Sequence, residues 1–191
     1  MGRKIVVGVT GASGAIYARS LLEILGELSD QLEEVALIFS DNGRAVWEFE
    51  LGHIPPFSAP FRVYDNNNLF APVASGSAGF DTMFIAPCTM GTLGRIAAGT
   101  SSDLICRSAD VMLKERRRLI VVPRELPLSL IHIENMRTVT LAGGIIVPAS
   151  PSFYSRPSSM EELVRTVVFR MIDLAGLELP HYRWGEAKSD S

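Results

Sequence analysis

Five stretches of the chain are almost continuously apolar, without the alternation of apolar and polar residues that marks a half-exposed strand. They cover residues 4–10, 34–40, 82–88, 118–124 and 144–150. Runs of this length and composition are typical of strands buried on both faces, as in a parallel sheet covered by helices. We therefore expect five buried strands.

Helical periodicity separates most of these strands. Residues 15–28 and 160–175 place apolar side chains at intervals of three and four, which predicts two helices with one buried face each. Strands that alternate with helices predict an α/β fold. We expect a doubly wound, mostly parallel sheet with helices on both faces, a three-layer arrangement of the Rossmann or flavodoxin kind.

The segment from about 52 to 80 breaks this alternation. It holds four prolines, three consecutive asparagines and the run ASGSAG, so we expect a long loop with one short strand at 61–64. Long loops in compact domains are usually functional or lie at an interface. From about residue 180 the chain is polar, and we expect a tail that extends from the body. We interpret residues 1–191 as a single domain.

Composition excludes several classes of function. The 191 residues are enough for one domain with a substantial core, and the net charge of -3 argues against a nucleic-acid-binding protein that relies on a basic surface. The two cysteines and three histidines are scattered, which argues against a disulfide framework and a metal site. No stretch approaches the roughly 18 apolar residues of a membrane span, and no signal peptide is visible, so we expect a cytoplasmic protein.

Candidate binding groups lie at the ends of the predicted strands, where doubly wound sheets bind their ligands. Three strand ends carry hydroxyl groups or glycines before a helix: Gly11, Ala12 and Ser13; Ser40; and Thr89, Met90, Gly91 and Thr92. Hydroxyls and backbone amides at a helix start bind phosphate, but a single hydroxyl can also be only a helix cap. For Ser13 both interpretations remain open. Three such ends on one edge favour a nucleotide-like phosphate.

Arg124 ends the strand predicted at 118–124 and Glu125 follows it, both between Pro123 and Pro127. As an exposed ion pair they would contribute little to stability. The two prolines stiffen this turn, however, which suits side chains that are positioned for a ligand. Arg124 would then bind an anion or a carbonyl-rich ring, and Glu125 would move a proton.

Several longer stretches together resemble one known family. These stretches are TGASGA, APVASGS, PCTMGTL, RSADVMLKERRRLIVVPRELPLSLIHIENM and PSFYSRP, and they resemble the UbiX/Pad1 flavin prenyltransferases of the homo-oligomeric flavin-containing cysteine decarboxylase superfamily. The resemblance runs in order from about residue 4 to RWGE near residue 186.

The resemblance implies an enzyme that needs no metal and transfers a dimethylallyl group from dimethylallyl monophosphate to N5 and C6 of reduced FMN. The product, prenylated FMN, would serve a UbiD-type decarboxylase, for instance in ubiquinone biosynthesis. It also implies a homo-oligomer, usually a dodecamer.

The resemblance assigns a role to individual residues. It implies that FMN is held by Gly11, Ala12, Ser13, Ser40, Thr89, Met90, Gly91, Thr92 and Arg124. It implies that the phosphate of the prenyl donor is bound, across subunit boundaries, by Arg107, Lys114, Tyr154 and Arg170, and that the site is covered by Trp184. The catalytic residues it implies are Glu125 for proton transfer and phosphate departure, together with Ser13 and Glu50.

Two other functions are weighed against this one. Flavin-dependent decarboxylases of peptidyl or phosphopantothenoyl cysteine carry PASANT, an active-site histidine and a P-x-M-N motif; here the strand end reads PCTMGT, and residues 61–81 contain no histidine. A non-catalytic flavin-binding subunit would lack the donor pocket, whereas all four of its residues are present here. The sequence does not decide between a monophosphate and a diphosphate donor, because a Lys/Arg pocket suits both.

Overall fold

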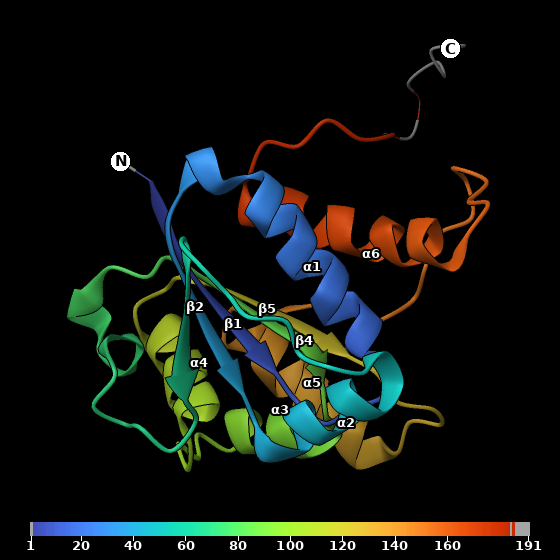
Figure 1. Ribbon diagram of the computed structural model, residues 1–191. Coiled ribbons are helices and arrows are strands. Elements are labelled where there is room, and N and C mark those ends of the chain that lie inside the picture. The colour runs from blue at the N-terminus through green and yellow to red at the C-terminus, as the bar shows by residue number, and fades with distance from the viewer. Residues whose placement is uncertain (1, 184, 186–191) are drawn as a thin grey trace.

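A computed structural model of the chain describes residues 2–183 and 185, and Figure 1 shows a single sheet between two layers of helices. The strands of this sheet are β1 (Arg3–Val9), β2 (Leu32–Phe39), β3 (Phe61–Asp65), β4 (Thr82–Cys88), β5 (Arg118–Pro123) and β6 (Ile145–Ile146). They lie in the order β3-β2-β1-β4-β5-β6, and every neighbouring pair is parallel. The predicted doubly wound α/β fold is confirmed, with its topological switch point between β1 and β4.

Within the described residues, six α-helices cover the two faces of the sheet. They are α1 (Ala15–Glu27), α2 (Asp41–Leu51), α3 (Met90–Ala97), α4 (Leu104–Lys114), α5 (Leu130–Leu141) and α6 (Met160–Ala175). Residues of α1, α2 and α6 belong to one hydrophobic cluster, and residues of α3, α4 and α5 belong to the other (Figure 1). The helices at 15–28 and 160–175 are therefore confirmed almost to the residue.

Burial on both faces explains the continuous apolar runs. Ile5 and Val7 of β1 pack into the cluster under α1 and α6, while Val6 between them packs into the opposite cluster. Successive side chains of a strand point to opposite faces, so a strand covered on both sides needs an apolar residue at every position.

The sheet differs from the expectation at one edge. Instead of a strand over 144–150, only Ile145 and Ile146 pair with β5 as a regular ladder. Pro148 cannot donate a backbone hydrogen bond, although Val147 and Ala149 still bond to Val121 and Pro123. A proline-rich end is tolerated at this position because β6 is an edge strand.

The long loop and the C-terminal segment carry more structure than expected. The short strand predicted at 61–64 is confirmed as β3, and two short 3₁₀ helices, Pro72–Ala74 and Gly76–Ala78, follow it. After α6 the chain stays attached to the body: Leu177 is buried, and the ring of His181 stacks on Phe169. The tail expected to extend from about residue 180 is thus fastened at His181.

Candidate active site

The residues that directly follow β1, β2, β4 and β5 lie together at the carboxyl edge of the sheet, which we call the carboxyl rim. Hydrogen bonds hold its parts in register. The Thr10 hydroxyl donates to the carbonyl of Pro87 over 2.8 Å and accepts from the Thr89 amide over 2.8 Å. The Ser40 amide donates to the Val9 carbonyl over 3.0 Å. The predicted meeting of the strand ends is therefore seen in the backbone.

The turn after β1 is shaped by its glycines. A Cβ atom on Gly11 would lie 2.5 Å from Cβ of Asn42, so no larger residue fits without a shift. Gly14 has a φ of 108° and is the N-cap residue of α1, without a side-chain cap. The alternative that Ser13 is only the N-cap of this helix is wrong, because Ser13 precedes the cap position and its side chain bonds to Glu50 instead.

Glu50, at the end of α2, supplies the missing cap of α1. Its carboxylate accepts hydrogen bonds from the amides of Gly14 at 2.9 Å and Ala15 at 2.8 Å. Partial burial alone would raise the pKa of Glu50, but the bonds from Ser13, Ala15 and Gly14, with the charge of Arg124 nearby, hold it below its usual value. Glu50 therefore stays ionised and lies beside Ser13 and Arg124.

Ser40 and Thr89 both act as helix caps. The Ser40 hydroxyl accepts from the Gly43 amide over 3.0 Å at the start of α2. The Thr89 hydroxyl accepts from the Thr92 amide over 3.1 Å at the start of α3, and it donates to the Thr92 hydroxyl over 2.9 Å. A capping hydroxyl that accepts one bond retains its hydrogen, so Ser40 is still able to donate to a ligand.

The start of α3 has room for a ligand. Gly91 is exposed, and a Cβ atom added to it would meet nothing within 4 Å. The first amides of a helix have no partner within the helix and carry the positive end of its dipole, which favours a phosphate. The start of α1 is occupied by Glu50, so the open start of α3 is the part of the carboxyl rim with room for an anion.

Arg124 and Glu125 are both exposed at the carboxyl rim. Arg124 lies over the first turn: a Cβ atom on Gly14 would be 3.9 Å from Arg124 Cγ, and its charge counteracts the rise that burial causes in the pKa of Tyr17. The carboxylate of Glu125 accepts only a local hydrogen bond, from the Leu126 amide at 3.0 Å, among those that the structure describes. Their roles as positioned binding groups stay a prediction.

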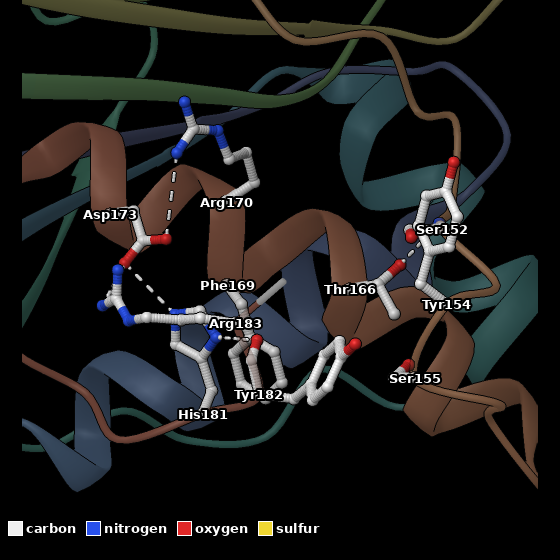
Figure 2. Close-up of a pocket in the computed structure, with 10 residues that line it drawn as sticks. All are labelled: Ser152, Tyr154, Ser155, Thr166, Phe169, Arg170, Asp173, His181, Tyr182 and Arg183. Atoms are coloured by element: carbon white, nitrogen blue, oxygen red, sulfur yellow. Dashed lines mark hydrogen bonds and ion pairs between the residues drawn. The ribbon is translucent and has the colours of Figure 1, made fainter. Parts of the chain in front are cut away.

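Two of the four residues expected to bind the donor line one cavity beside α6. Tyr154 and Arg170 line an open cavity of about 350 Å³, to which residues of the C-terminal segment also contribute (Figure 2). Arg170 is on α6, and Tyr154 is in the loop before that helix.

Within one chain, the other two donor residues are not brought to this cavity. Arg107 is on α4, where it donates to the Ala74 carbonyl over 3.1 Å and pairs with Asp110 over 2.7 Å. Lys114 is the last residue of α4 and pairs with Glu115. Helix α4 covers the face of the sheet opposite to α6. Trp184 lies outside the described residues.

The sequence interpretation missed several residues of these sites. Thr10 links two strand ends, and Arg95 donates to the Thr92 hydroxyl over 3.2 Å. In the cavity on α6 it missed Asp173, His181 and Arg183. Asp173 follows Arg170 by three residues on a helix, a spacing that places both side chains on one face. That spacing was a signal available in the sequence.

Neither a metal site nor a membrane span is found in the part of the chain that the structure describes. Over residues 2–183 and 185, no three His, Cys, Asp or Glu side chains gather closely enough to hold a metal ion. None of the helices there combines the length and the apolar character needed to cross a bilayer.

Comparison with known proteins identifies the relatives of this chain. The sequence model of the Flavoprotein family matches residues 1–170. Flavin prenyltransferase UbiX of Methanocaldococcus jannaschii is 41% identical over 187 residues, which cover 95% of this chain and 98% of that protein. The same enzyme of Thermoplasma acidophilum is 44% identical over 176 residues, 91% of this chain and 95% of that protein. The chain belongs to the UbiX family of flavin prenyltransferases.

Solved structures agree with the UbiX assignment. The structure of AnUbiX in complex with FMN and dimethylallyl pyrophosphate has a TM-score of 0.90 and 42% identity, covering 97% of this chain and all (100%) of that one. A dodecameric FMN-dependent UbiX-like decarboxylase from Escherichia coli O157:H7 has a TM-score of 0.84 and 38% identity, over 94% of this chain and 98% of that one. A PPC decarboxylase, 14% identical with a TM-score of 0.66, shares the fold alone. The resemblance predicted from the sequence is confirmed.

Proposed function

We propose that this protein transfers a dimethylallyl group from a dimethylallyl phosphate ester to N5 and C6 of reduced FMN, and so makes prenylated FMN. The observation that carries this proposal is the carboxyl rim, where Ser13, Glu50 and Arg124 meet next to the open start of α3. In a member of the UbiX family, such a rim fits the flavin phosphate and the edge of its ring system.

Different residues of the carboxyl rim bind different parts of FMN. Thr89, Met90, Gly91 and Thr92 form the start of α3. The amides of Met90 and Gly91 are the candidates to receive the phosphate, because those of Thr89 and Thr92 already donate to hydroxyls. Arg124 lies over the turn of Gly11, Ala12 and Ser13, and Ser40 adds a hydroxyl from the next strand end. Bound reduced FMN supplies the nucleophilic N5 and C6 atoms that receive the allyl group.

The donor needs cations around its phosphate. Breaking an allylic C–O bond places negative charge on the phosphate and positive charge on carbon, so a positioned Arg or Lys lowers the barrier by about 3 kcal/mol. Arg170 and Tyr154 offer such groups at the cavity on α6. Glu125 is the candidate for the proton that accompanies phosphate departure, because its carboxylate is exposed and used only locally.

The complete site requires neighbouring subunits. Arg107 and Lys114 lie on α4, on the face of the sheet opposite to α6, so one chain does not gather all four donor residues. A homo-oligomer brings different faces of identical chains together. A dodecamer, the state of the E. coli relative, is the assembly we propose, with FMN and donor bound between subunits. We place the reaction in the cytoplasm and the use of prenylated FMN in a UbiD-type decarboxylase.

The released leaving group, phosphate or pyrophosphate, shows which dimethylallyl ester is the donor. Wild-type protein is incubated without oxygen with either dimethylallyl monophosphate or dimethylallyl pyrophosphate, in the presence or absence of reduced FMN. We expect inorganic phosphate from the monophosphate, released only when FMN is present. Pyrophosphate release with equal efficiency would show that both esters are donors. Release that does not depend on FMN would contradict prenyl transfer, because it would be simple hydrolysis.

A further inference from the structure

The chain after α6 is fastened to the rest of the protein at several points. The Gln31 side chain forms two hydrogen bonds with the backbone of Glu178, over 2.8 and 3.0 Å. Leu177 is buried, and the imidazole of His181 stacks on the ring of Phe169 with centroids 4.7 Å apart and 10° between the planes. We call residues 177–183 the C-terminal strap. It forms one wall of the cavity that contains Tyr154 and Arg170 (Figure 2).

One carboxylate ties this strap to α6. Oδ1 of Asp173 bonds to Nε2 of His181 at 3.1 Å and accepts from Nη2 of Arg183 at 2.8 Å. Oδ2 of the same carboxylate faces Nη1 of Arg170 at 3.9 Å. The Asp173 side chain is 15% exposed, and that of His181 is 7% exposed. Asp173 therefore joins the strap, on one side, to Arg170 on the other.

The cluster retains positive charge. Two guanidinium groups, those of Arg170 and Arg183, share the single carboxylate of Asp173, so the set has an excess positive charge even with a neutral imidazole. Their side chains are 65% and 51% exposed, which leaves donors on both free to meet a ligand. A guanidinium presents five N–H donors, more than one carboxylate can use. An anion in the cavity would find two arginines held near each other.

We infer that Asp173 is a positioning residue that fastens the C-terminal strap and so holds Arg183 beside Arg170, as a second arginine for the phosphate of the prenyl donor. This inference rests on the proposed function, because it takes the cavity on α6 as the place of the donor phosphate. Without Asp173, the two like charges would repel, and the strap would lose the acceptor shared by His181 and Arg183. In this arrangement Arg183 binds the donor phosphate, and Asp173 keeps the Arg183 side chain oriented toward it.

The variants separate these roles. Arg183→Gln removes one exposed cation and leaves the stacked His181 in place. Asp173→Asn keeps the shape of the side chain but removes its charge. Arg183→Lys keeps the charge and is the conservative variant. Glu33→Gln, which breaks a surface ion pair of similar length (3.2 Å, with Lys4) outside the cavity, is the matched control.

Steady-state kinetics test the inference with reduced FMN at saturation and dimethylallyl monophosphate as the varied substrate. We expect the KM for the donor to rise about tenfold in Arg183→Gln and Asp173→Asn, because a hydrogen bond to a charged group is lost or misdirected. The affinity for FMN, measured by flavin fluorescence, stays as in wild type, and Arg183→Lys recovers part of the loss. Glu33→Gln leaves both quantities unchanged. Equal donor KM values in wild type and Arg183→Gln would overturn the inference.

Binding of inorganic phosphate gives a readout that does not depend on turnover. Isothermal titration of the FMN-loaded protein with inorganic phosphate should show weaker binding in Arg183→Gln and Asp173→Asn than in wild type and Glu33→Gln. Wild-type protein that binds phosphate in this pattern but makes no prenylated flavin would contradict the proposed function, while Asp173 would still be the residue that positions Arg183 at a phosphate site. Equal phosphate affinities in all four proteins would contradict the inference itself.

Discussion

Glu50 shows how one side chain serves both the fold and the site. It caps α1 from the end of α2, and it lies between Ser13 and Arg124 at the carboxyl rim. The sequence placed it near the site only through the family resemblance, since nothing in its local pattern predicts that a residue on the next helix would cap α1. The contact between Glu50 and the start of α1 is a tertiary contact, whereas sequence patterns predict only caps that come from residues next to the helix start.

The lowered pKa of Glu50 predicts a pH-dependent contribution to stability. Because the pKa in the folded protein lies below its usual value, the carboxylate stabilises the fold above the unfolded pKa, and this contribution is lost as pH falls through the folded pKa. Glu50→Gln should therefore lower the unfolding temperature at pH 7 and make no difference in strong acid. Thermal unfolding of both proteins across acidic pH checks this. A difference that grows toward low pH would show that the sign is wrong.

Glu125 is the residue for which a purely chemical role is expected. Its carboxylate is exposed and accepts only a local bond, so its replacement should cost little stability. We predict that Glu125→Gln binds FMN as wild type does but slows prenylation at least about a hundredfold, within the range for general acid–base catalysis. Flavin titration and a prenylation time course measure the two effects. Full activity in Glu125→Gln would remove the proton-transfer role.

At the scale of elements, the strands and the first and last helices were predictable because they are long and periodic. β1, β2, β4, β5, α1 and α6 need an apolar residue at each buried position, and the sequence shows this directly. The last strand was overestimated, since an apolar run such as GIIVPAS does not reveal that it will lie at an edge beside Pro148. Arg107 and Lys114 were expected to bind the donor across subunit boundaries. Within one chain their helix covers the face opposite to α6, so their role stays a prediction.

Thr89 caps α3 and, in the proposed function, also belongs to the turn that binds FMN. Thr89→Val removes the hydroxyl that accepts from the Thr92 amide and should cost about 1 kcal/mol of stability. It should also lower the affinity for FMN, because the hydrogen bond that holds the turn is lost. Thr89→Ser keeps the hydroxyl and serves as the matched control, with near wild-type stability and FMN affinity. If Thr89→Val binds FMN as tightly as Thr89→Ser, the turn is a cap alone.

At the scale of the whole molecule, the surface of α5 points to assembly. Leu130 and Ile131 are 73% and 71% exposed, and only Val139 of this helix is buried. Exposed apolar side chains in such a group are typical of an interface. This surface supports the proposal that identical chains assemble through α5.

Disruption of this surface should therefore reduce both mass and activity. We predict that Ile131→Glu gives particles smaller than wild type in light scattering coupled to size exclusion, because a charge is then buried at the interface. Thr138→Glu introduces a charge at another exposed position of α5 and serves as the control. A wild-type mass for Thr138→Glu would show that assembly depends on the apolar residues and not on every exposed position of the helix. An Ile131→Glu protein with the mass and the activity of wild type would exclude Ile131 from the assembly.

The most direct test of the account is the mass of the flavin after turnover. Purified protein is incubated without oxygen with reduced FMN and dimethylallyl monophosphate, and the released flavin is analysed by mass spectrometry. We predict a gain of one five-carbon unit that requires both substrates and forms at least about a hundredfold more slowly with Glu125→Gln. Unmodified FMN, recovered from folded protein that binds the flavin and offered either phosphate ester, would contradict it.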